Sequence, residues 1–600
     1  MEKLSDEENL PMDEKWPAPN LITYTTLING FTRSGKSDAC ARSENVIVRM
    51  EERGIIPDTV AYTSVMDCYA KCTGNEERVL AAEKALAMLE RVENLYMQSK
   101  SNEIKPNVST YATCIRAIAN SKGNTSTVDM ALGVLRRMDD IFKFQTIEGI
   151  KPTTTIYNAV IECVGKYYSG GGKGPRRAEE LLDEMFERYQ AGVEEVKPNA
   201  RTYAAVMLTW TRTNERKDVV ATNVQRLLDK FERIYKDRAT TIMPNVVCYT
   251  ICMQAWGKCH RPDKSELLLN KMRKIYRDTR DENIRPNSIS YATVINAYGS
   301  SREKGAAFNA QRILDKIMIS IDDKPDDGNK IDCKPNTFIF NSLLNAYSHS
   351  GECDSGRLAE KVLFQMKYLV DLGYLQSAPD IISYNTVMTA YANQQNIEGA
   401  NGAQKILNQM ESEYVNGNSR IKPDLLSFNT VLKSWARSGH SQCADRARMI
   451  LLKLEKMGHN GETSLKPNGY SYTTTINAAA FTTGSVEERL HAFNIARYCY
   501  EGLRDSDHAE SNHVTFGTML KAISNLIPSD LSERDYWAKL VFEESCQLGC
   551  VNDFVLRQFL RAASPSLRRQ LLPNYKSGNM SIESIHLPYE WSKKVLKNRY

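Results

Sequence analysis

Apolar and polar positions alternate along this chain with the period of an amphipathic α-helix. In the segment 381–391, Val387, Met388 and Tyr391 come three, four and seven residues after Tyr384, which places all four on one face of a helix. A turn rich in Gly, Ser and Asn then leads to a second amphipathic segment, as in residues 444–457 of another copy of the pattern. The sequence therefore predicts helical hairpins joined by polar turns.

A fixed phrase marks the start of each hairpin. It consists of a proline, a polar residue and, four places after the polar residue, an aromatic residue, and it occurs twelve times, with the proline missing from the last copy at Asn512. Proline is tolerated only at or before the first turn of a helix, so the phrase indicates where each hairpin begins. A phrase that returns at a nearly constant period predicts stacked repeats, an all-α solenoid. The expected repeats start near residues 21, 59, 108, 154, 200, 246, 288, 337, 381, 425, 469 and 513.

The domain organisation follows from these starts. We expect an N-terminal segment at 1–20, a repeat array at 21–552, and a partial repeat with a basic C-terminal tail at 553–600. The aromatic residue of the phrase and a bulky residue seven places later share the apolar helical face. We interpret both as core packing, and the alternative is a stripe on which bases stack.

The opening segments resemble pentatricopeptide repeats. Tyr384-Asn385-Thr386-Val387-Met388 and Phe428-Asn429-Thr430-Val431-Leu432, each preceded by Pro-Asp, carry this resemblance, which extends over the array. Tetratricopeptide repeats, at 34 residues, lack such an opening. The resemblance implies a right-handed α-solenoid superhelix of about twelve helix-turn-helix repeats. Most units here are longer than is usual in that family, and we expect the extra length around the second helix and the loop after it.

In that family, each repeat reads one base of single-stranded RNA through two or three side chains. The resemblance assigns this role to the residue after the aromatic and to the polar residue of the next phrase. A carboxylate can accept from the imino N–H of uracil or guanine, and an asparagine amide can donate or accept. The predicted base-reading pairs are Thr25 with Asp58, Thr63 with Asn107, Asn158 with Asn199, Thr250 with Asn287, Asn341 with Asp380, Asn385 with Asp424, Asn429 with Asn468, and Thr473 with Asn512.

These pairs imply a base sequence for the bound RNA. Thr with Asp indicates guanine, Thr with Asn adenine, Asn with Asn a pyrimidine that is preferably cytosine, and Asn with Asp uracil. The remaining four units have Ala or Gly after the aromatic and should discriminate weakly. The resulting footprint is G-A-n-C-n-A-n-U-U-C-A-n, written 5′ to 3′ as the family's orientation implies. The alternative role for each polar residue of the phrase is that of a helix N-cap.

A recurrent cation supports RNA binding. Nine places after the aromatic come Arg33, Lys71, Lys166, Arg212, Lys258 and Arg437, with His349 in a seventh unit. Cations at one recurrent place would line one groove and contact phosphates. The alternative is the ordinary preference of a helix C-terminus for positive charge. The net charge of +5 permits a polyanionic partner without requiring one.

Other motifs suggest chemistry that the sequence does not support. Residues 30–37 match the phosphate-loop pattern letter by letter, but a helix is predicted where that loop needs a preceding strand. His508 and Glu510 provide half of a zinc deaminase motif without its cysteines, and the paired cysteines at 68/72 and 248/252 have no second pair to complete a metal site. We therefore expect no enzyme activity, no metal and no cofactor.

The sequence and the resemblance together predict a sequence-specific single-stranded RNA-binding protein. It would act in organellar RNA processing, stability or translation, as a monomer that can recruit RNA-processing proteins. The alternative is a helical-repeat scaffold that binds other proteins without RNA specificity. No apolar stretch approaches the roughly 20 residues of a membrane helix, so no membrane partner is expected. The family implies a mitochondrion or a plastid, although the acidic residues 1–14 do not resemble an import peptide, and the N-terminus is expected to be incomplete.

Overall fold

Helices form all the regular structure in the described part of the chain. The computed structural model describes residues 19–144, 146–168, 172–237, 242–301, 303–322, 335–375, 378–572 and 587–597. Within these ranges the regular elements are α-helices and short 3₁₀ helices, which confirms the all-α prediction. The chain divides into two compact units, 1–286 and 287–600, which are described separately below. Most of the predicted N-terminal segment and parts of the basic tail lie outside the described residues.

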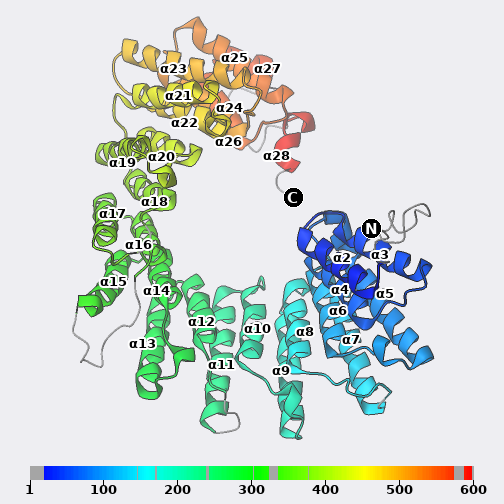
Figure 1. The fold of residues 1–600 in the computed structure, drawn as a ribbon. Helices are drawn as coiled ribbons and strands as arrows, with labels where there is room; N and C mark the ends of the chain where they lie inside the picture. The colour runs from blue at the N-terminus through cyan, green and yellow to red at the C-terminus, as the bar shows by residue number, and fades with distance from the viewer. Residues whose placement is uncertain are drawn as a thin grey trace, which may run out of the picture. The chain divides into compact units, whose positions relative to one another are not determined.

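Unit 1 is a row of helical hairpins (Figure 1). The first helices of these hairpins contact one another in chain order, so that they form one layer, and the second helices pack behind them. The first helices are α2 (Leu21–Ser34), α4 (Thr59–Lys71), α6 (Val108–Asn120), α8 (Thr154–Tyr167), α10 (Ala200–Thr211) and α12 (Val246–Lys258). The second helices are α3 (Ala39–Glu52), α5 (Asn75–Ser99), α7 (Thr125–Phe144), α9 (Lys173–Gln190), α11 (Lys217–Lys236) and α13 (Pro262–Thr279).

Unit 2 repeats this arrangement and adds a final first helix. Its first helices are α14 (Ser288–Ser301), α16 (Thr337–His349), α18 (Ile381–Ala392), α20 (Leu425–Ala436), α22 (Gly469–Ala480), α24 (His513–Leu526) and α26 (Asp553–Ala562). Its second helices are α15 (Ala306–Asp322), α17 (Ser355–Asp371), α19 (Ile397–Val415), α21 (Cys443–His459), α23 (Val486–Arg504) and α25 (Ser532–Gln547). The short elements α27 (Pro565–Leu571), η8 (Tyr589–Trp591) and α28 (Lys593–Lys597) follow α26.

The polar residue of the repeated phrase caps the first helix of each hairpin. Asp424 Oδ1, for example, accepts a hydrogen bond from the Ser427 backbone N–H at 2.8 Å, and the same geometry recurs at most other seams. Thr153 is an N-cap as well, but its side chain makes no capping bond. A side-chain oxygen at this place satisfies a backbone donor that the helix itself cannot pair. The capping role proposed from the sequence is therefore confirmed for these residues.

The extra length of the repeats lies where the sequence placed it. First helices contain 12 to 14 residues up to α24, whereas α5 contains 25 and α7 contains 20. A one-turn 3₁₀ helix often follows the second helix, as at η5 (Ser419–Ile421) and η6 (Thr463–Leu465). Each of these turns buries one apolar side chain, Ile421 or Leu465, directly before the next seam. The additional residues therefore extend the outer layer and leave the starts of the first helices unchanged.

The aromatic residues of the phrase lie in the core, as predicted. Tyr62, Tyr111, Tyr249 and Tyr384 are almost fully buried between first and second helices. Their hydroxyls reach carboxylates of the second helices, as in the 2.6 Å bond from Tyr111 to Glu93. The bulky residues seven places later also pack inward, and the Trp210 indole N–H donates to Glu179 at 2.7 Å. Neither set forms an exposed stacking stripe.

The burial of these tyrosines predicts sensitivity to alkaline pH. The pKa of Tyr62 is raised to about 12, mainly by burial; the charge of Glu51 adds to this rise, and the charge of Arg91 opposes it. Burial likewise raises the pKa of Tyr347 to about 12. A phenol whose pKa is higher in the folded than in the unfolded state stabilises the fold below the unfolded pKa of about 10, and this contribution is lost as the pH rises towards 12. Between the unfolded pKa of about 10 and a pH of about 12, we expect helicity to fall as the absorbance of tyrosinate rises. Tyrosines that titrate at their ordinary pKa with the helices intact would contradict this expectation.

Candidate nucleic-acid interface

Two of the predicted base-reading pairs are in direct contact in unit 2. Asn341 Nδ2 donates to Asp380 Oδ1 at 3.4 Å, and Asn385 Nδ2 donates to Asp424 Oδ1 at 3.3 Å. In each case one residue comes from the start of a first helix and the other from the cap of the next first helix. Neighbouring repeats therefore bring together side chains that are 39 residues apart in the sequence.

A hydroxyl at the third residue of the next helix joins each pair. Ser427 Oγ lies 2.7 Å from Asn385 Oδ1 and 2.8 Å from Asp424 Oδ1. Ser471 Oγ connects Asn429 and Asn468 in the same way, at 2.7 Å and 3.1 Å. The last predicted pair is bridged by Thr515, whose Oγ1 lies 2.8 Å from Thr473 Oγ1 and 3.4 Å from Asn512 Oδ1. These bridges fix the orientation of the amide and carboxylate groups.

Capping uses only one of the two polar atoms at the end of each seam side chain. In Asp380 and Asp424, Oδ1 accepts the bonds from the backbone, the serine and the asparagine. Among the residues that the structure describes, neither Oδ2 has a hydrogen-bond partner. The amide nitrogen of Asn468 has no partner in this part of the chain either, while its Oδ1 accepts from Ser471. Capping and ligand binding are thus compatible in one side chain.

In unit 1, two predicted pairs line hollows between neighbouring first helices. Thr63 and Asn107 line a hollow of about 560 Å³ to which α2, α4 and α6 contribute. Asn158 and Asn199 line another, of about 430 Å³, to which α6, α8 and α10 contribute. Both volumes fall within the range of about 300–1,000 Å³ that is usual for small-molecule sites.

The other two pairs that begin in unit 1 are Thr25 with Asp58 and Thr250 with Asn287. The described side chains of Thr25 and Asp58 are not hydrogen-bonded to each other. Thr25 Oγ1 donates to the Leu21 carbonyl oxygen at 2.8 Å, and Asp58 Oδ1 caps α4. Thr250 Oγ1 bonds to the Val246 carbonyl oxygen of its own helix at 2.7 Å. Its predicted partner Asn287 belongs to unit 2, so this pair spans the two separately described units.

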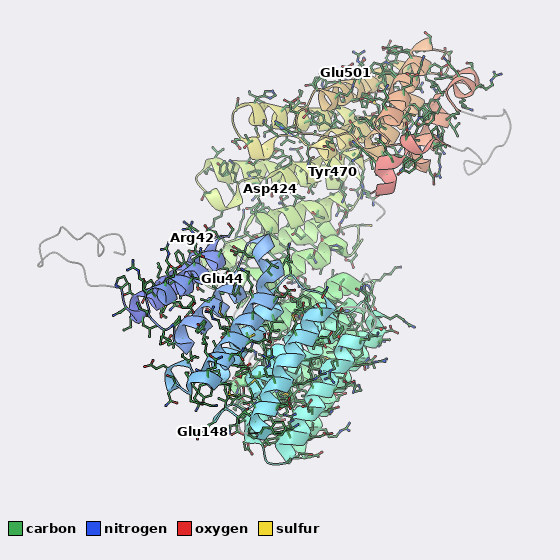
Figure 2. All side chains as sticks on the ribbon, turned by 90° about the vertical axis from the view of Figure 1, so that its right-hand side faces the viewer. Arg42, Glu44, Glu148, Asp424, Tyr470 and Glu501 are labelled. Carbon is green, nitrogen blue, oxygen red and sulfur yellow. The ribbon has the colours of Figure 1, made fainter. Side chains whose placement is uncertain are left out.

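Exposed apolar side chains lie beside the pairs, and the sequence analysis did not single them out. The second residue of most first helices is a large apolar residue exposed to solvent: Ile22, Val60, Val247, Ile289, Phe338, Ile382, Leu426, Tyr470 and Val514. Each precedes a base-reading position by three residues, which places the two on one helical face. Ile382 and Leu426 expose 59% and 60% of their surface, and a recurrent row of exposed apolar side chains is typical of a binding surface. Figure 2 labels Asp424, the N-cap of α20, and Tyr470, in the first turn of α22.

Family models match the chain in both units. The PPR repeat family matches residues 19–71, the pentatricopeptide repeat domain residues 94–167 and 375–437, and the PPR repeat residues 247–275. The matches at 19–71, 94–167 and 375–437 include first helices with their caps, the part of the hairpin that carries the pairs, whereas the match at 247–275 begins inside α12. The chain belongs to the pentatricopeptide repeat family.

Relatives of this pentatricopeptide repeat protein are distant in sequence. A chloroplastic pentatricopeptide repeat-containing protein of Arabidopsis thaliana is 26% identical over 204 residues, which are 34% of this chain and 32% of the relative. The mitochondrial 15S rRNA processing factor CCM1 of Yarrowia lipolytica is 25% identical over 185 residues, 31% of this chain and 19% of the relative. The chain thus spans about a third or less of these curated relatives. The crystal structure of PPR10 in complex with an 18-nucleotide psaJ RNA element aligns with 18% identity and a TM-score of 0.32, over 95% of this chain and 86% of that one.

The predicted phosphate-binding cations of the pentatricopeptide repeats end the first helices but differ in their surroundings. Lys71 forms an ion pair with Asp67 at 2.7 Å, which also pairs with Arg116 at 2.8 Å. Lys166 donates to the Ala119 carbonyl oxygen at 2.6 Å. Arg212 and Arg437 are the C-cap residues of α10 and α20, and Arg33, Lys258 and His349 lie in the last turns of α2, α12 and α16.

A second set of cations lies closer to the base-reading positions. Arg116, Lys433 and Lys521 come five places after the aromatic, one helical turn beyond the base-reading position of the same helix. Burial lowers the pKa of Lys433, and the charge of Arg437 lowers it further. The sequence signal for this set was present, but it occurs in three repeats only and was therefore missed.

The motifs set aside in the sequence analysis have structural explanations. Residues 30–34 of the phosphate-loop pattern belong to helix α2, so a helix stands where a strand would be required. Within the described ranges, no three His, Cys, Asp or Glu side chains are arranged to hold a metal ion. The helices in those ranges also lack the combined length and apolarity needed to cross a membrane.

Proposed function

We propose that this protein binds single-stranded RNA and places one base at each junction between neighbouring first helices. The observation that carries the proposal is the contact between Asn385 and Asp424. It orients both side chains and leaves Asp424 Oδ2 available beside the exposed side chain of Leu426. A polar edge and an apolar surface at one place are what an unpaired base requires.

The atoms available at each junction define the base. A carboxylate oxygen such as Asp424 Oδ2 accepts from the imino N–H of uracil, whereas the amide of Asn468 can donate to a ring nitrogen. The exposed apolar residues of adjacent helices, such as Ile382 and Leu426, would lie against the two faces of the base. Stacking on aromatic side chains contributes about 1–3 kcal/mol per base, and Phe338 and Tyr470 provide aromatic surfaces of this kind.

The twelfth repeat departs from this scheme. A side chain in place of Gly517 would overlap the ring of Phe554, the second residue of α26. The base-reading place of this repeat is therefore filled by the protein itself. We propose a footprint of eleven positions, G-A-n-C-n-A-n-U-U-C-A, in which the bases named are those of the eight pairs.

The relatives support a site of action for the proposed protein. They include a mitochondrial 15S rRNA processing factor and a chloroplastic pentatricopeptide repeat-containing protein. We propose that this chain likewise acts on an organellar transcript, in its processing, stability or translation. It would act by binding, as a monomer without enzyme activity of its own, and would recruit processing proteins where RNA is to be cut.

Binding to the proposed footprint is the direct test of this function. We expect the RNA G-A-n-C-n-A-n-U-U-C-A to bind at least about 100-fold more tightly than a scrambled RNA of equal composition, since each mismatch costs about 1–3 kcal/mol. Filter binding at a fixed salt concentration measures both affinities. Equal affinity for the two RNAs would contradict base reading and favour the protein scaffold. Strand orientation is tested with the same sequence reversed.

A further inference from the structure

The row of first helices continues beyond the last base-reading pair but changes its chemistry. Helix α26 begins at the cap Asn552, whose Oδ1 accepts from the Val555 N–H at 3.0 Å as at the other seams. It packs against α24 in the same way as α24 packs against α22. At the base-reading place, five residues after the cap, α26 has Arg557 in place of a small neutral residue. One helical turn further on it has Arg561.

The side chain of Phe554 closes the preceding junction to a base. Gly517 is the only glycine at a base-reading place, and the ring occupies the space into which any larger side chain would extend. Phe554 itself remains partly exposed at the edge of α26. A strand that follows the row would therefore meet an aromatic edge and then two arginines where earlier repeats present a hydrogen-bonding pair.

Positive charge from α24 adds to that of α26. Lys521 lies one turn beyond Gly517, and its Nζ is 3.6 Å from the centre of the exposed Phe481 ring. Lys521 and Arg561 lie on helices that pack against each other. Burial lowers the pKa of Lys521, and the charge of Arg561 lowers it further. Arg557 and Arg561 are exposed, and among the described residues neither forms an ion pair with a carboxylate.

Within the described part of the chain, no carboxylate lies within ion-pair distance of Lys521, Arg557 or Arg561, and the nearest polar groups of α25 bind backbone atoms. Arg534 of α25 directs its guanidinium to the carbonyl oxygens of Ile527, Arg561 and Ala562. The carboxylate of Asp535 accepts from the Ser564 backbone N–H at 2.8 Å. Like charges held together without a counter-charge are unfavourable unless an anion joins them.

We propose that Lys521, Arg557 and Arg561 form an exit clamp for the phosphodiester backbone of RNA leaving the row of first helices. The clamp rests on the proposed RNA-binding function and extends it to nucleotides that no repeat reads. It binds phosphates rather than bases, since guanidinium groups pair with phosphate oxygens through several N–H donors. The base-specific footprint then ends at the junction of Thr473 with Asn512, and the next nucleotides add affinity regardless of their sequence.

The clamp is tested with two RNAs and one double variant. One RNA ends at the last specified base, and the other carries four further nucleotides on the side that α26 would meet. For the intact protein, we expect the longer RNA to bind about fivefold to tenfold more tightly at low salt, equally for an oligo(U) or an oligo(A) extension. In Arg557→Gln/Arg561→Gln this advantage should disappear. For the longer RNA, log affinity decreases with log salt, and the magnitude of this slope should be smaller in the variant by about 0.7 for each phosphate that it no longer binds.

Controls distinguish the clamp from the function on which it rests. Arg497→Gln, which removes a partly exposed cation from α23, should keep the advantage of the longer RNA, and Arg557→Lys/Arg561→Lys should restore most of it. Unchanged helicity of the double Gln variant, together with unchanged binding of the shorter RNA, shows that the fold is intact. A wild-type protein that binds the shorter RNA specifically but gains nothing from the extension overturns the clamp alone. Failure to bind either RNA overturns the proposed function and the clamp together.

Discussion

Replacing Asn385 with Thr and Asp424 with Asn is expected to change the base preferred at the ninth repeat from uracil to adenine. The present pair is held by the 3.3 Å bond between the two side chains, with Asp424 Oδ2 available as an acceptor. An asparagine at position 424 would present a donor at that place, which suits a ring nitrogen of adenine. Discrimination by one such contact is about 1–3 kcal/mol, so the ratio of the affinities for the two bases should change by about 100-fold or more.

The double substitution should leave the fold intact. The side-chain oxygen of the introduced asparagine can still accept from the Ser427 backbone N–H, which now lies 2.8 Å from Asp424 Oδ1. Threonine is the residue found at the place of Asn385 in other repeats. Competitive binding of two RNAs that differ only at this base measures the effect. Thr386→Ala, on the same helix, is the matched control and should keep the preference for uracil. An equal loss of affinity for both RNAs would indicate that the pair only positions the helix.

Replacing Tyr384 with Ala is expected to lower the free energy of unfolding by about 3–5 kcal/mol. The side chain is 1% exposed, and it fills the space between α18 and its neighbouring helices. Its hydroxyl donates to Glu413 at 2.8 Å, and Lys367 and Gln409 also bind that carboxylate. Truncation therefore removes the core packing of one hairpin and opens a cavity that the stacked helices cannot close.

Tyr384→Phe is the control for the hydroxyl alone. It keeps the ring and removes one hydrogen bond, and since Glu413 retains its other partners, we expect a loss of about 1 kcal/mol. Denaturant unfolding measures the loss of stability. Because stacked repeats can unfold in parts, hydrogen exchange of the α18 amides should be measured as well, to report on this hairpin alone. If Ala and Phe were equally destabilising, the hydroxyl rather than ring packing would hold this hairpin.

Helix positions could be predicted from the sequence because the repeated phrase carries both a helix start and a core residue. Pro423 and Asp424 mark the start of α20, and Phe428 marks its buried face. Periodicity alone did not identify the exposed role of the second residue, because Ile382 and Tyr384 are both large and apolar. The periodicity placed Tyr384 in the core, but the role of an exposed apolar side chain such as Ile382 depends on what lies against it, which the sequence pattern leaves open.

Contacts between repeats were the least predictable part of the candidate site. The sequence could pair Asn341 with Asp380 only through the family resemblance, since nothing local connects two residues 39 positions apart. The obstruction of the twelfth repeat by Phe554 was not visible either, because α26 lacks the proline and the aromatic residue of the phrase. Both features depend on the distance between adjacent first helices.

The sharing of one side chain between helix capping and base reading restricts how such an array can change its target. Every seam residue except Thr153 offers an acceptor oxygen to the helix, as Asp424 Oδ1 does for Ser427. Aspartate and asparagine meet that demand with the same shape and differ only in the second terminal atom, which faces away from the helix. A substitution of one for the other would change the base that the repeat prefers and would leave the folding stability almost unchanged. Retargeting could therefore proceed one base at a time through proteins that all remain folded.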